Sequence, residues 1–90
     1  SYMGAYTISN SALISIAVFE TRRISGVVNV HNINSRTDSR GVSFNMTVTL
    51  KYGAKIYDVC EKIQTAVKES VEEYTSLNMC RVNILVKAVV

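Results

Sequence analysis

The chain has 90 residues and a mass of 10.0 kDa, so we expect one domain over residues 1–90, with its core at about residues 8–89. Hydrophobic residues make up 48% of the sequence and charged residues 19%, which excludes a disordered chain, and the small size leaves little space for a deep substrate cavity. The sequence has no apolar run of about 18 to 20 residues, no signal peptide and only two cysteines, which together predict a cytoplasmic protein with free thiols.

The first half of the chain predicts a helix followed by two strands. Ser9 is a typical N-cap, and apolar residues at three- and four-residue spacing predict a helix over residues 10–22. The alternation of β-branched residues predicts a strand over residues 27–33, and the polar stretch over residues 32–40 predicts a loose hairpin connection. Strict alternation of apolar and polar residues predicts a second strand over residues 42–51.

The second half predicts a long helix and a third strand. Residues 56–74 carry an apolar stripe at helical spacing, and residues 80–89 alternate again as a strand does. The order α-β-β-α-β predicts an α+β two-layer sandwich in which both helices cover one face of a three-stranded sheet. Within that sheet, we favour the first strand in the middle, antiparallel to both neighbours, over a mixed sheet with the second strand in the middle.

The sheet face opposite the helices is the candidate interaction surface. Alternation places on it a set of mostly polar residues of the second and third strands, namely Asn45, Thr47, Lys51, Arg81, Asn83, Leu85 and Lys87. Asn29 and His31 join this set if they face the same way. Leu85 among polar neighbours suits a protein contact, although an ordinary solvated surface explains these residues equally well.

The charges of the chain are segregated. The helix over residues 56–74 has five carboxylates and two lysines, a net charge of −3, whereas the rest of the chain carries a net charge of +6. A basic surface attracts polyanions such as nucleic acids, and it also occurs where charges are merely solvated. The candidate face has no aromatic residue for base stacking, so we favour a protein partner over a nucleic acid.

The sequence offers no catalytic, cofactor or metal site. His31 is the only histidine, and HxxxH and HExxH spacings are absent, so a transition metal lacks ligands. No GxSxG elbow, Walker loop or GxGxxG motif occurs. Cys60 and Cys80 fall at core positions, where a thiol packs as a small unreactive group. We therefore predict a protein that is not an enzyme.

Several short signatures are collinear along the chain: Ile8-Ser9, Ile16-Ala17, Gly26-Val27, Lys51-Tyr52-Gly53, Gln64 with Val67, and Val82-Asn83-Ile84-Leu85-Val86. In this order and spacing the chain resembles the alkaline shock protein family of mainly Gram-positive bacteria, over about residues 8–89. The chain departs from the family at Ser76, where glycine is common. It also lacks the proline that is common at the start of the second helix, which covers residues 56–74. These departures affect helix caps more than the fold.

The resemblance implies a cytoplasmic, non-enzymatic domain in cell-envelope homeostasis and the alkaline stress response. It also implies self-association and a protein partner, since an integral membrane protein holds some members at the membrane. We therefore expect an interaction or scaffold domain that is peripheral to the membrane through a partner, without direct insertion. The alternative is a small nucleic-acid-binding domain that uses a basic open sheet face.

Overall fold

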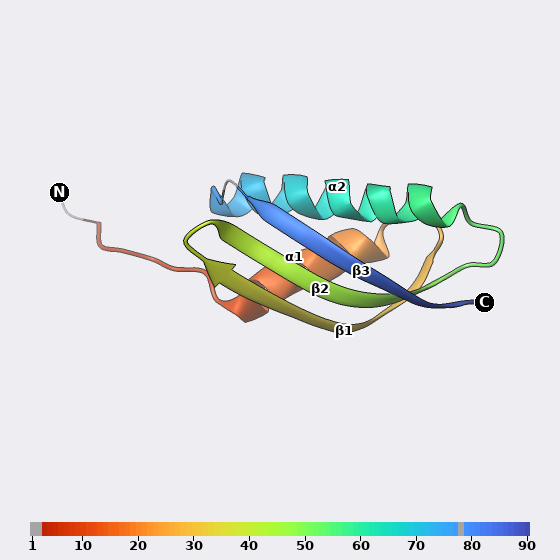
Figure 1. Ribbon diagram of the computed structural model, residues 1–90. Coiled ribbons are helices and arrows are strands. Elements are labelled where there is room, and N and C mark those ends of the chain that lie inside the picture. Colours follow the sequence, from red (N-terminus) through yellow and green to blue (C-terminus); the bar gives the residue numbers. More distant parts are fainter. Residues whose placement is uncertain (1–2, 78) are drawn as a thin grey trace.

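The computed structural model describes residues 3–77 and 79–90, which form two layers (Figure 1). Along the chain the elements are α1 (Asn10–Arg22), β1 (Val27–Asp38), β2 (Gly41–Leu50), α2 (Ile56–Thr75) and β3 (Cys80–Val89). Both helices pack on one face of the three-stranded sheet, and the opposite face, here termed the open face, is uncovered. The α+β fold, the element order and the placement of both helices are confirmed.

The strand order is β1-β2-β3, so the expectation that the first strand lies in the middle is wrong. The central strand β2 pairs antiparallel with β1 and parallel with β3. A parallel neighbour needs a long crossover connection, and α2 supplies one between β2 and β3. The central position also suits the composition of β2, because its inward side chains are all apolar and all buried: Val42, Phe44, Met46, Val48 and Leu50.

β1 continues to Asp38, through much of the stretch that the sequence suggested was a loop. Residues 34–38 pair with residues 41–45 of β2, and a turn of two residues, Ser39 and Arg40, closes the hairpin. The side chain of Asp38 supports this turn, because its Oδ1 accepts a hydrogen bond of 2.8 Å from the backbone N–H of Arg40. Pairing with an apolar central strand thus overrides the low strand propensity of asparagine, serine and aspartate.

The helix caps explain where α1 begins and α2 ends. Ser9 Oγ accepts a hydrogen bond of 3.1 Å from the backbone N–H of Ala12, so the predicted N-cap is confirmed. At the end of α2, Ser76 has a φ of 60°, the left-handed conformation that glycine adopts at least cost. The departure from glycine therefore falls at a backbone position that a side chain disfavours.

The hydrophobic core lies between the sheet and the helices, and it determines which strand residues face outward. The buried apolar residues outside β2 are Leu13 and Ala17 of α1, Val59, Ile63, Val67 and Val71 of α2, and Val82 of β3. Alternate side chains of a strand point to opposite faces. The residues between these core positions on β2 and β3, together with the matching residues of β1, therefore form the open face.

Candidate interaction surface

Three asparagines form a row across the open face. The strand register places Asn34 beside Asn45, and Asn45 beside Asn83. Asn83 Nδ2 donates to Asn45 Oδ1 at 3.2 Å, and Asn45 Nδ2 donates to Asn34 Oδ1 at 3.4 Å. This asparagine row is a continuous chain of side-chain amides that joins all three strands.

A second row, the arginine row, lies two residues closer to the β1–β2 turn. It consists of Arg36, Ser43 and Arg81, which are aligned by the same register. Two residues of a strand span about 6.7 Å, so the two rows lie side by side. Among residues 3–77 and 79–90, neither Arg36 nor Arg81 has an ion-pair partner. Both guanidinium groups are therefore free to bind a carboxylate or phosphate.

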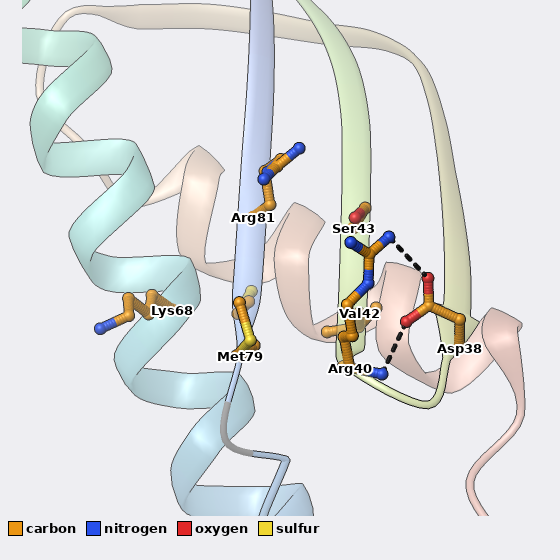
Figure 2. A pocket seen from close by; sticks show the side chains of 9 residues that line it. Asp38, Arg40, Val42, Ser43, Lys68, Met79 and Arg81 are labelled. Carbon is orange, nitrogen blue, oxygen red and sulfur yellow. Dashed lines mark hydrogen bonds and ion pairs between the residues drawn. The ribbon is translucent and has the colours of Figure 1, made fainter.

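A pocket of about 420 Å³ adjoins the arginine row (Figure 2). The hairpin, the start of β3 and α2 line it, with Asp38, Arg40, Gly41, Val42, Ser43, Lys68, Met79, Cys80 and Arg81. Figure 2 shows Arg81, Ser43 and Arg40 on the same side of the sheet, whereas Lys68 extends from α2 away from them. The pocket thus presents two guanidinium groups and a hydroxyl group toward the open face.

The carboxylate that lines this pocket is already engaged. Asp38 Oδ2 lies 3.7 Å from Arg40 Nη2. The hydrogen bond from the backbone N–H of Arg40 is the main cause that lowers the pKa of Asp38, and the Arg40 guanidinium lowers that pKa further. An ionised Asp38 therefore neutralises Arg40 in part, which leaves Arg36 and Arg81 as the unpaired arginines of this end of the sheet among the described residues.

The middle of the open face carries an apolar side chain among polar ones. Leu85 is 64% exposed and pairs in register with Thr47 of β2. A shallow hollow beside Leu85 is lined by Asn32, Asn34, Asn45, Met46, Thr47, Asn83, Ile84 and Leu85. An exposed leucine with polar neighbours fits both an interface anchor inside a polar rim and an ordinary solvated surface.

The structure brings most of the predicted surface residues together. The group on neighbouring positions of β2 and β3 is Asn45, Thr47, Arg81, Asn83 and Leu85. Lys87 is the extra residue of a bulge, because Val86 and Ala88 pair with consecutive residues of β2. Lys51 lies beyond the end of β2 and lines a separate hollow between the turn after α1 and the start of α2.

Sequence reasoning did not place Asn34 and Arg36 on the candidate surface, because it interpreted their stretch as a connection between strands. The sequence signal for a strand is weak here, because Ser35, the inward residue after Ile33, is polar. In the structure Ile33 and Ser35 are half-buried, whereas Asn34 and Arg36 are exposed. His31, which the alternation placed on this face only conditionally, has its Nε2 2.8 Å from Thr49 Oγ1 of β2. The histidine ring is therefore engaged in a cross-strand hydrogen bond.

Both cysteines are half-buried and pack against the core, and both are free. Burial raises the pKa of the Cys60 thiol. Burial, with a smaller contribution from the Glu72 carboxylate, raises the pKa of the Cys80 thiol from 9.0 to about 11. Since the thiolate is the nucleophile, the raised pKa values agree with the predicted low reactivity of these thiols.

The raised pKa of Cys80 predicts a loss of stability in alkali. The folded chain holds the thiol protonated, so this contribution is complete below pH 9.0 and is lost as the pH rises toward about 11. We expect the urea midpoint of the wild type to fall more between pH 8 and pH 10.5 than that of Cys80→Ala. Tyrosines and lysines titrate in both proteins, so the variant corrects for them. Equal falls in the two midpoints would contradict this prediction.

Within residues 3–77 and 79–90, neither helix combines the length and the apolar character needed to cross a bilayer. The same residues contain no cluster of three histidine, cysteine, aspartate or glutamate side chains that could hold a metal ion.

Comparison with known proteins gives one family and one group of similar folds. A model of the alkaline shock protein family, described as having a cell envelope-related function, matches residues 30–90. The nickel form of a MamM CTD variant is similar in structure, with a TM-score of 0.68 and 18% identity over 87% of this chain and 96% of that chain.

A zinc form of MamM CTD gives a TM-score of 0.64 and 20% identity, over 87% of this chain and 84% of that chain. Identities this low show a shared fold alone. No curated protein matches the sequence.

Proposed function

Because this chain belongs to the alkaline shock protein family, whose function is related to the cell envelope, we propose that it is a non-enzymatic interaction domain of the cell envelope. In this proposal it serves envelope homeostasis and the alkaline stress response of a Gram-positive bacterium from the cytoplasmic side. The open face is the surface that contacts its protein partners.

The observation that carries this proposal is the exposed Leu85 within the hydrogen-bonded polar surface of the open face. Interfaces commonly place an apolar anchor at the centre of a polar rim, and a few such anchors supply most of the binding energy. The asparagine row and Thr47 lie beside Leu85 and line the same hollow, so hydrogen-bond donors and acceptors border the apolar side chain. Side chains that are already held by hydrogen bonds lose less conformational entropy when a partner binds.

We propose two occupants for this role, an integral membrane protein that anchors the domain at the membrane and further copies of the chain. The anchor supplies the membrane attachment, so the domain itself does not insert. Self-association supports a scaffold, because many copies on one anchor form a layer beneath the envelope. A nucleic acid is the competing partner, but none of the described open-face residues is aromatic.

The substitution Leu85→Asp tests the proposal. We expect it to reduce the recovery of protein partners on the tagged domain by about tenfold or more, because a charge replaces the apolar anchor of the interface. The free energy of unfolding should change by less than about 0.5 kcal/mol, since the side chain is at the surface. The measurement is affinity capture from detergent-solubilised extract, with and without nuclease treatment, together with light scattering of the purified domain at several concentrations.

Tyr57→Asp is the matched control, because Tyr57 is 90% exposed and lies on α2 in the opposite layer. It should leave both capture and self-association unchanged. If Leu85→Asp behaves like Tyr57→Asp in both assays, the open face is not the interaction surface. If every partner is lost on nuclease treatment, the domain acts on nucleic acid instead.

A further inference from the structure

We propose that the open face binds an acidic, extended segment of a partner protein. Carboxylates of that segment contact Arg36 and Arg81, and its backbone lies along the asparagine row. This inference rests on the proposed function and adds to it the chemical class of the partner.

The first argument is the distribution of charge. Arg36 and Arg81 lie on the open face without an ion-pair partner among the described residues. The carboxylates lie elsewhere: five are on α2, Glu20 is on α1, and Asp38 is paired with Arg40. Cationic groups with no compensating carboxylate attract an anionic partner and repel a basic one.

The second argument is the spacing of the two arginines. They stand on the outer strands of the sheet, two strand separations apart, so their Cα atoms are about 10 Å from each other. Carboxylates at alternate positions of an extended peptide lie about 7 Å apart on one side. The long arginine side chains cover this difference, and each guanidinium can bind one carboxylate through two parallel hydrogen bonds.

The third argument is the asparagine row, which distinguishes a peptide from other anions. Among residues 3–77 and 79–90, Asn34 Nδ2 and Asn83 Oδ1 have no hydrogen-bond partner, so one end of the row offers a donor and the other an acceptor. An extended peptide backbone carries both complementary groups. A nucleic acid offers mainly phosphate acceptors and requires aromatic surfaces for its bases, which the described open face lacks.

The test is binding of a fluorescein-labelled peptide of alternating glutamate and serine, measured by anisotropy at low salt. We expect it to bind the wild type, while the same peptide with glutamine in place of glutamate does not. Arg36→Gln combined with Arg81→Gln should weaken binding by about tenfold or more. Arg22→Gln combined with Arg23→Gln is the matched control, because it removes the same charge from the end of α1 in the opposite layer, and it should weaken binding less than about twofold.

Three results overturn the inference. The first is no binding of the glutamate peptide to the wild type. The second is an equal loss in both double variants, which would assign binding to overall charge. The third is tighter binding of a uridine decanucleotide that also depends on Arg36 and Arg81, which would assign the face to nucleic acid.

Failure here is distinguishable from failure of the proposed function. If Leu85→Asp abolishes partner capture while the glutamate peptide does not bind, the open face remains the interaction surface and only the acidic class of partner is wrong.

Discussion

Gly41→Ala should lower the free energy of unfolding by about 3 kcal/mol, as measured by urea denaturation. Gly41 has a φ of 144°, which residues with a side chain rarely adopt. A Cβ at this position would overlap the backbone carbonyl oxygen of Met79 and lie 2.8 Å from the Met79 Cβ. The overlapping atoms belong to the backbone just before β3, so the start of β3 must move to accommodate the methyl group.

Gly53→Ala separates this overlap from backbone strain. Gly53 also has a positive φ, of 91°, but a Cβ there meets no atom within 4 Å. It should cost only about 1 kcal/mol, the usual penalty of a left-handed backbone. If Gly41→Ala and Gly53→Ala lower the free energy of unfolding by similar amounts, the overlap between the added Cβ and Met79 does not contribute to the loss of stability.

The close approach of Gly41 to Met79 also links the fold to the candidate surface. The backbone N–H of Val42 donates to the carbonyl oxygen of Met79 at 2.9 Å, next to the pairing of Ser43 with Arg81. A displaced β3 therefore moves Arg81 away from Ser43 and breaks the arginine row. Gly41→Ala should weaken acidic-peptide binding even under conditions in which the variant remains folded.

The elements that the sequence predicted best are those in which burial is periodic. β2 alternates without exception in its apolar residues, and the inward stripe of α2 repeats at helical spacing, so local pattern alone locates both. β1 fails this criterion beyond Ile33, because Ser35 is its next inward residue and carries no apolar signal. The strand order failed for a different reason, since it depends on which strands pair and not on any single segment.

On the candidate surface, too, local pattern located some residues, whereas others depended on how the strands pair. Parity within β2 and β3 placed Asn45, Asn83 and Leu85 on one face, and this required no knowledge of pairing. The asparagine row required the register between strands, and a shift of one residue would have turned Asn34 toward the core. Single-sequence periodicity does not determine the register, so the hydrogen-bonded row and the two unpaired arginines became visible only in the structure.

Phe44→Ala should cost about 3 to 5 kcal/mol of the free energy of unfolding. Phe44 is fully buried in the central strand, and it pairs with Ser35 of β1 and Val82 of β3. The alanine variant loses the transfer energy of the ring and leaves a cavity that two packed helices close only in part. Because small domains have about 5 to 15 kcal/mol of stability in total, this is a large fraction.

Phe19→Ala makes the same chemical change at the surface and is the control. Phe19 is 62% exposed on α1, and its ring lies under the Arg23 guanidinium at 5.3 Å. Its loss should cost no more than about 1 kcal/mol, the value of an exposed cation–π contact. A Phe44→Ala variant as stable as Phe19→Ala would mean that β2 is not the centre of the core. The open face, whose rows depend on the parity of β2, would then have to be reassigned.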